Sequence, residues 1–171
     1  KHKLPATIFV SPSSIQNKQN FWFQEIKNFD ILELKKIVSS VTNVDFNLIK
    51  KYNISNIMKS LSLDLIWESI NCYKKKFNIN SIPFQNMSVD NLLEINNSKL
   101  VEIGSHTQNH PILSNENDIK CKQEISDSIT SLSSILSKEI RYFAYPNGNP
   151  IYDFGNREIN ILESNGCKLA F

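Results

Sequence analysis

Short apolar runs alternate with helical patterns through the second half of the chain, an order that few folds accommodate. Strand-like runs occupy residues 100–103, 143–145 and 167–171, and helical patterns lie between them, one reaching about residue 137 and one at 153–165. Residues 6–10 form a similar run that is apolar at nearly every position, typical of a strand buried on both faces. This alternation predicts a parallel α/β sheet, which right-handed crossovers would curl toward a barrel.

The helix between the second and third of these runs should pack on the sheet through one apolar face. Ser114 or Asn115 can serve as its N-cap, and the serines from 126 to 137 would face solvent. Gly104 would end the strand before it, and Gly166 has the favoured position just past the last helix. The residues expected on the apolar face are Ile119, Ile125, Ile129, Leu132 and Leu136.

Residues 13–98 have a mostly helical pattern and predict an insertion between two strands. The expected helices include one at about 56–77, with Ser55 as N-cap, and one at 89–96, with Ser88 as N-cap. Four aromatic residues of the insertion could stack on sugars, or anchor helices to a core. We favour the core, because aromatic residues dominate core burial; they are Phe21, Trp22, Phe23 and Trp67.

Composition excludes some partners. A net charge of +2 over 171 residues is too small to indicate a nucleic-acid or membrane-surface partner. No apolar run approaches the ~20 residues of a membrane span, and no signal peptide is visible. Cys72, Cys121 and Cys167 lack metal or redox spacing and are expected to be small, mostly buried hydrophobes. Location stays open between the cell envelope and the cytoplasm of a bacterium. Both ends run directly into strand-like segments, which suggests a fragment.

Two of the three histidines, His106 and His110, lie four residues apart just after the run at 100–103. Gly104 and Pro111 argue against a helix there, so both rings should lie where a strand passes into a loop. Two neutral imidazoles can supply half of a tetrahedral zinc site. Thr107 occupies the position where the zinc-protease helix motif requires Glu, which excludes that motif. The alternative is a polar loop whose histidines bond only to the backbone.

The order of motifs resembles the polysaccharide deacetylases, carbohydrate esterase family 4. The His-Thr-x-x-His motif is followed by a helix, a Pro-x-Gly loop at Pro146–Asn147–Gly148, and a Lys-Leu-Ala-Phe segment at the end of the chain. The resemblance implies that His106 and His110 bind Zn²⁺ or another divalent metal and that Thr107 braces their loop. It further implies that Tyr145, Pro146, Asn147 and Gly148 wall the groove and lend an oxyanion donor.

The sequence departs from the family's usual Arg-Pro-Pro-Tyr-Gly motif. Ala144 stands in place of the Arg and Asn147 in place of the Tyr, while Arg141 is in a different register. Family members take two carboxylates from an Asp-Asp motif before residue 1 and a general acid from a His after residue 171. No acidic residue or histidine within the chain replaces them by motif, including Asp90, Asp118, Asp127, Asp153 and His2.

The resemblance therefore implies a single, incomplete domain over residues 1–171: a partial, distorted (β/α) barrel with the helical insertion, expected to be inactive alone. The whole protein would remove N-acetyl, or O-acetyl, groups from a polysaccharide or oligosaccharide. Open sheet edges would favour a homo-oligomer. Two alternatives remain: a non-catalytic carbohydrate-binding module on the same fold, and a different metal hydrolase that uses only the histidine pair.

Overall fold

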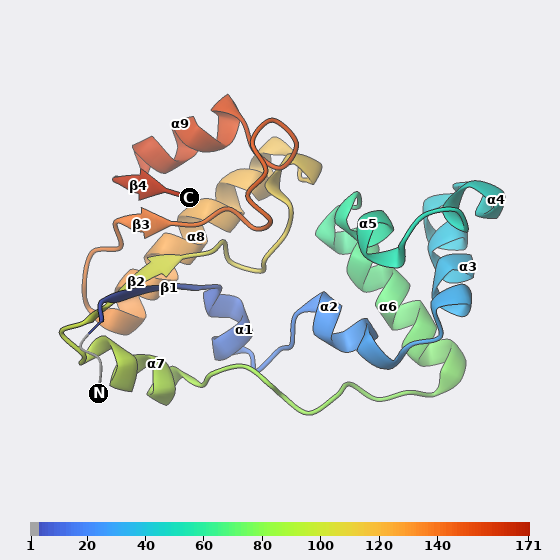
Figure 1. The fold of residues 1–171 in the computed structure, drawn as a ribbon, viewed down its shortest axis with the longest axis horizontal. Helices are drawn as coiled ribbons and strands as arrows, with labels where there is room; N and C mark the ends of the chain where they lie inside the picture. Colours follow the sequence, from blue (N-terminus) through green and yellow to red (C-terminus); the bar gives the residue numbers. More distant parts are fainter. Residues whose placement is uncertain (1–3) are drawn as a thin grey trace. The chain divides into compact units, whose positions relative to one another are not determined.

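The computed structural model describes residues 4–171 (Figure 1). They divide into two compact units, one made of the described residues up to Gln19 together with Gln85–Phe171, the other of Asn20–Phe84. The first contains every strand found among residues 4–171 and both loop histidines, and the second is helical. His2 lies outside the described residues.

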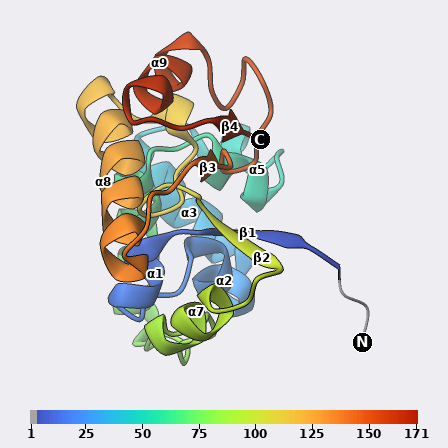
Figure 2. The same cartoon turned by 90° about the vertical axis from the view of Figure 1, so that its left-hand side faces the viewer.

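The sheet has four parallel strands in the order β1-β2-β3-β4: β1 Ala6–Val10, β2 Val101–Ser105, β3 Tyr142–Phe143 and β4 Leu169–Ala170. The predicted parallel α/β sheet is therefore confirmed. Within residues 4–171 the sheet is open, with β1 and β4 at its edges, so it does not close into a barrel. Helix α8, Asp118–Leu136, runs along one face of the sheet (Figure 2).

Strand β1 is less buried than its sequence predicts. Ala6 and Thr7 are exposed, Ile8 and Phe9 are half-buried, and only Val10 is buried. The cause is its edge position, because only its carboxyl end reaches the core formed with Ile15 and Leu92. The expectation of burial on both faces is wrong for this strand.

Gly104 does not end β2, as the sequence suggested, but lies inside it. Gly104 pairs with Phe9 across the parallel ladder. A Cβ at position 104 would lie 2.6 Å from two ring carbons of Phe9 and 2.8 Å from the carbonyl oxygen of Tyr142. The glycine is therefore required by the close approach of neighbouring strands.

Helix α8 begins later than expected, because the 3-10 helix η2, Leu113–Asn115, precedes it and Asn117 is the N-cap. Its buried residues follow one stripe: Cys121, Ile125, Ser128, Leu132 and Leu136. Ile119 was predicted on this stripe, but it is 73% exposed. Ile119 lies two residues before Cys121, which is about 200° around the helix, so Ile119 points away from the sheet.

The expected solvent position of the α8 serines is wrong for Ser128. Its side chain is fully buried, and its hydroxyl lies 2.6 Å from that of Ser105 at the end of β2. Each hydroxyl thus has a partner, which avoids the cost of burying a polar group alone. The pair ties the carboxyl end of β2 to α8.

Three shorter helices complete the first unit: α1 Pro12–Gln16, α7 Val89–Asn96 and α9 Asn156–Ser164. Ser88 caps α7 as predicted, and its hydroxyl accepts the N–H of Asn91. Gly166 follows α9 with a φ of +76°, as its position predicts. Helix α9 itself starts three residues after the predicted 153.

The second unit contains α2 Trp22–Glu25, η1 Ile26–Asn28, α3 Ile31–Thr42, α4 Phe46–Ile49, α5 Ile54–Lys59 and α6 Leu63–Phe77. This compact unit, Asn20–Phe84, covers only part of the helical segment between β1 and β2, because α1 and α7 pack in the first unit. Its core includes Leu34, Val38, Met58 and Ile70, all fully buried.

The predicted single helix at 56–77 is wrong, because serines interrupt it. The Ser60 hydroxyl donates to the Ile57 carbonyl and Ser60 ends α5, while Ser62 is the N-cap of α6. Serine hydroxyls compete for backbone groups in this way and favour helix ends. Ser55 is not the N-cap of α5 either; Asn53 is, and its side chain accepts the Ser55 N–H.

The aromatic residues of this unit mostly serve its core. Trp22 is buried and Trp67 packs against the same cluster, as favoured from the sequence. The rings of Phe29 and Tyr73 stack with centroids 3.9 Å apart. Phe23 differs, since it is 44% exposed and stacks on Phe21.

Two compositional expectations can also be compared with the structure. None of the helices within residues 4–171 combines the length and apolarity that crossing a membrane would need. Of the cysteines, Cys121 is buried and Cys167 half-buried, but Cys72 is exposed, so the expectation of mostly buried thiols is wrong for Cys72.

Candidate metal centre

His106 directly follows β2, at the carboxyl end of the parallel strands. Its N–H donates to the Val10 carbonyl at 3.0 Å, and its own carbonyl accepts the Ser11 hydroxyl at 2.7 Å. Both contacts extend the β1–β2 pairing by one residue. The backbone of His106 is therefore held by the sheet, at the edge where sites of parallel α/β folds are usually built.

The ring of His106 has a defined tautomer. Its Nδ1 lies 2.7 Å from the carbonyl oxygen of Ala144, just after β3. Because a carbonyl can only accept, Nδ1 carries the proton and Nε2 carries the lone pair. Burial lowers the pKa of His106, with the Ala144 hydrogen bond opposing in part. The ring is thus held neutral near pH 7, as a metal ligand must be.

The loop between the histidines is irregular and internally braced. Thr107 and His110 have φ values of +64° and +65°, so the expected absence of a helix is confirmed. The fully buried Thr107 hydroxyl donates to the His106 carbonyl and accepts the His110 N–H at 3.0 Å. This hydroxyl thereby joins the backbones of the two histidines.

The two imidazoles lie edge to face. Their ring centroids are 4.6 Å apart with an interplanar angle of 81°. Imidazole nitrogens are among the ligands that zinc prefers. Over residues 4–171, no set of three or more His, Cys, Asp or Glu side chains gathers that could hold a metal. The pair has the donor chemistry for half of a zinc site, and residues 4–171 bring no carboxylate to it.

Sequence reasoning missed Glu124 of α8, which binds the loop. Its two carboxylate oxygens accept the backbone N–H and the side-chain amide of Asn109, at 2.8 and 2.7 Å, and its carbonyl accepts the Gln108 N–H at 2.9 Å. Burial raises the pKa of Glu124, and the hydrogen bonds from Asn109 lower it in part. The available signal was its place directly before Ile125, beside the buried stripe of α8.

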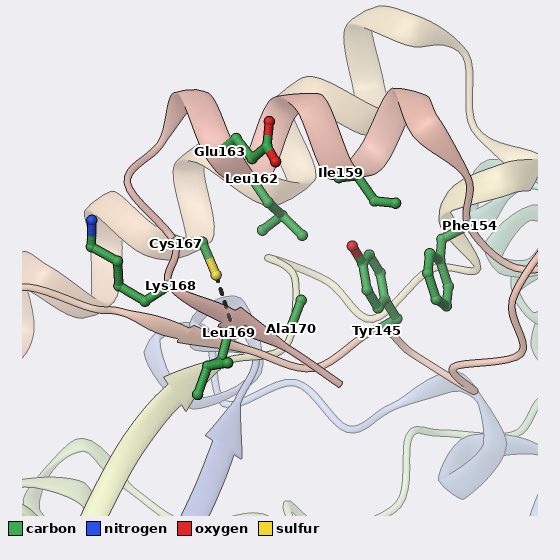
Figure 3. Close-up of a pocket in the computed structure, with 9 residues that line it drawn as sticks. All are labelled: Tyr145, Phe154, Ile159, Leu162, Glu163, Cys167, Lys168, Leu169 and Ala170. Atoms are coloured by element: carbon green, nitrogen blue, oxygen red, sulfur yellow. Dashed lines mark hydrogen bonds between the residues drawn. The ribbon is translucent and has the colours of Figure 1, made fainter.

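Tyr145 turns its ring toward α9. The ring stacks on Phe154 with centroids 3.6 Å apart, and burial raises the pKa of Tyr145 to about 12. Tyr145 lines a pocket of about 290 Å³. Figure 3 shows its ring in this pocket, with residues of α9 and β4 along the other walls. Neither His106 nor His110 lines this pocket. The Tyr145 N–H donates to the Phe171 carbonyl at 2.8 Å.

The Pro-x-Gly segment forms a tight turn after the buried Pro146. Asn147 and Gly148 have φ values of +66° and +68°. The Asp153 carboxylate closes the turn, accepting the Asn147 side-chain amide and the Asn149 N–H, both at 2.7 Å. Asp153 therefore holds this loop and does not begin α9, as the sequence had suggested.

The other charged candidates lie where the sequence placed them or on the surface. Asp90 is on α7, and Asp118 and Asp127 are on α8. Arg141 pairs with Glu139 at 2.8 Å, and both side chains are exposed. The carbonyl that orients the His106 ring belongs to the backbone of Ala144, so no side-chain motif could have identified it.

Comparison with protein families matches residues 1–170 to the family described as polysaccharide deacetylase. A comparison with curated proteins finds no match. Among solved structures, IcaB from Ammonifex degensii is 20% identical with a TM-score of 0.45, over 65% of this chain and 55% of that one. A de-N-acetylase from Aggregatibacter actinomycetemcomitans is 14% identical with a TM-score of 0.42, over 98% of this chain and 85% of that one. The chain thus spans about half the length of the first of these structures.

Proposed function

Since this chain belongs to the polysaccharide deacetylase family, we propose that the whole protein is a metal-dependent hydrolase. It removes N-acetyl groups, or O-acetyl groups, from a polysaccharide or oligosaccharide. His106 and His110 provide two ligands of a divalent metal, with zinc as the favoured ion. Residues 1–171 alone are inactive in this proposal.

The observation that carries the proposal is the tautomer of His106. The hydrogen bond from Nδ1 of His106 to the Ala144 carbonyl leaves Nε2 as the nitrogen with the lone pair. The centroid of this ring lies 4.6 Å from the centroid of the His110 ring. In metal-binding histidines in general, a hydrogen bond from the ring nitrogen that does not bind the metal orients the ring. A histidine that served only as a core residue would not need a neighbouring imidazole.

The donor set fits a zinc site in part. Zinc in catalytic sites takes three protein ligands and leaves one position for water. In this family the third ligand and the general base are carboxylates, and the general acid is a histidine, all outside residues 1–171. Once bound, the ion would lower the pKa of its water to about 7 and polarise the carbonyl oxygen of the substrate.

The residues of this chain then have separate tasks. His106 and His110 would each hold the ion through a ring nitrogen, and Thr107 keeps their backbones together. Burial lowers the pKa of His106, which favours the neutral imidazole that binds metal.

Gly148 is the proposed oxyanion donor of the Pro-x-Gly turn. The Tyr145 N–H is bonded to Phe171, and Pro146 has no N–H. Of the four residues that the family motif implicates, Asn147 and Gly148 remain as candidates. We prefer Gly148, because it has no side chain to obstruct a substrate that approaches its N–H. Such a donor is worth about 2.7–4 kcal/mol in the transition state.

The test measures acetate release from N-acetylated oligosaccharides by the full-length protein with zinc. His106→Ala and His110→Ala should each reduce the rate at least about 100-fold, because loss of a metal ligand removes the metal's contribution. His2→Ala is the matched control, since it removes the third histidine of the chain, and it should leave the rate unchanged.

Other outcomes would support the alternatives. Glycan binding without acetate release would indicate a non-catalytic carbohydrate-binding module. Zinc-dependent hydrolysis of other substrates, with none of acetylated glycans, would indicate a different metal hydrolase. Full activity of both histidine variants would refute the proposal.

A further inference from the structure

The loop that carries both histidines is tied to α8 by one residue, Glu124. Its carboxylate accepts two hydrogen bonds from Asn109, at 2.8 Å from the backbone N–H and 2.7 Å from the side-chain amide. Its backbone carbonyl accepts a third, from Gln108 at 2.9 Å. Asn109 directly precedes His110, so these contacts hold the residue next to the second histidine.

This loop needs to be held from outside. Thr107 and His110 both have positive φ, a region that residues with a Cβ adopt only where surrounding contacts enforce it. The Thr107 hydroxyl braces the loop from within, but it does not fix the loop against the rest of the fold. Between the two histidines, Glu124 anchors the loop to α8, and the Ser13 N–H donates to the Gln108 carbonyl at 3.2 Å.

We propose that Glu124 is a positioning residue for the metal centre: its carboxylate clamps Asn109 so that the His110 ring faces the His106 ring. The inference rests on the proposed function, because the ring pair matters only if it binds metal. Glu124 acts through Asn109 and makes no contact with the metal itself.

The clamp needs an acceptor for the backbone N–H of Asn109 and a partner for its side-chain amide, and the two oxygens of a carboxylate are both acceptors. Glutamine at position 124 can make both bonds only if the Asn109 amide turns around, so that its oxygen accepts the glutamine NH₂. Alanine at position 124 removes both bonds. Aspartate is one methylene shorter and would not reach both groups from the same place on α8.

A reversed pair provides a specific rescue. In Glu124→Gln with Asn109→Asp, the glutamine oxygen can accept the backbone N–H of residue 109, and its NH₂ can donate to the new carboxylate. Both bonds of the clamp are restored with opposite side-chain polarity. Asn109→Asp alone leaves a carboxylate against a carboxylate.

The experiment measures zinc affinity of the full-length protein by chelator competition. Glu124→Ala and Asn109→Asp should each weaken affinity about 10–100-fold, the usual effect of disturbing a group that orients a metal ligand. Glu124→Gln alone should have a smaller effect, because the Asn109 amide can turn and restore both bonds. The reversed pair should recover most of the Asn109→Asp loss. Asp127→Asn, which removes an exposed charge from the same helix, should change nothing.

A second readout needs no metal. Hydrogen exchange of the backbone amide at position 109 should be faster in Glu124→Ala, which removes its acceptor, and slow in the reversed pair, which keeps one. Unchanged zinc affinity in Glu124→Ala, or no recovery of the Asn109→Asp loss in the reversed pair, overturns the proposal. If the unmodified protein binds no zinc, the proposed function fails and the positioning role fails with it, while amide exchange still shows whether Glu124 holds the loop.

Discussion

Replacing Gly104 by alanine should destabilise the sheet at the strand that leads to His106. The new methyl would lie 2.6 Å from two Phe9 ring carbons and 2.8 Å from the Tyr142 carbonyl oxygen. The ring can shift, but the carbonyl belongs to the neighbouring strand, so β2 and β3 must move apart. Overpacking of this kind costs about 1–3 kcal/mol.

The cost can be read as a melting temperature. For a chain of this size each kcal/mol corresponds to about 2–4 °C, so Gly104→Ala should lower the midpoint by about 2–12 °C. Circular dichroism at 222 nm would follow the transition. Phe9→Leu combined with Gly104→Ala should recover part of the loss, because it removes the ring contacts but not the contact with Tyr142.

Gly155→Ala is the matched control, because a Cβ there would have no atom within 4 Å. The loss of the glycine N-cap lowers the stability and the stiffer unfolded chain raises it, each by less than about 1 kcal/mol. If Gly104→Ala melts no lower than Gly155→Ala, the close approach of the strands is not as described.

Three other properties should follow from the structure. Hydrogen bonds from Lys36 and Lys76 lower the pKa of Glu33 from 4.5 to about 2. The stabilising effect of the Glu33 carboxylate is therefore present above pH 4.5 and lost as the pH falls toward 2. Urea should unfold Glu33→Gln more easily than the unmodified protein at pH 7 but not at pH 2. Burial raises the pKa of Cys121 to about 12, so a thiol reagent at pH 8 should modify the exposed Cys72 rapidly and Cys121 only after unfolding. Ile70 is fully buried in the helical unit, and Ile70→Ala should cost about 2–5 kcal/mol in chemical denaturation, an effect that a smaller loss would contradict.

The general fold could be predicted because the alternation of strands and helices is a local pattern. The caps at Ser88 and Gly166 were predictable for the same reason. The role of Gly104 was not, since it depends on Phe9, almost a hundred residues earlier in the chain. The exposure of Ile119 and the burial of Ser128 likewise depend on where α8 begins and what its partner strand presents.

The candidate site divides in the same way. His106, His110 and Thr107 belong to one short motif, so spacing alone could identify them. The groups that orient them lie elsewhere: the Ala144 carbonyl is a backbone atom, and Glu124 lies on a helix whose pattern marks only apolar positions. Contacts of these kinds join residues that are distant in the sequence, and the folded chain is needed to identify the partners.

The most direct test of the central claim is anomalous diffraction at the zinc absorption edge, from crystals of the full-length protein grown with zinc. We expect one ion bonded to Nε2 of His106 and to a nitrogen of His110 at about 2.0–2.1 Å, with Nδ1 of His106 still bonded to the Ala144 carbonyl. No ion between the two rings, or an ion bonded to Nδ1 of His106, would contradict the account.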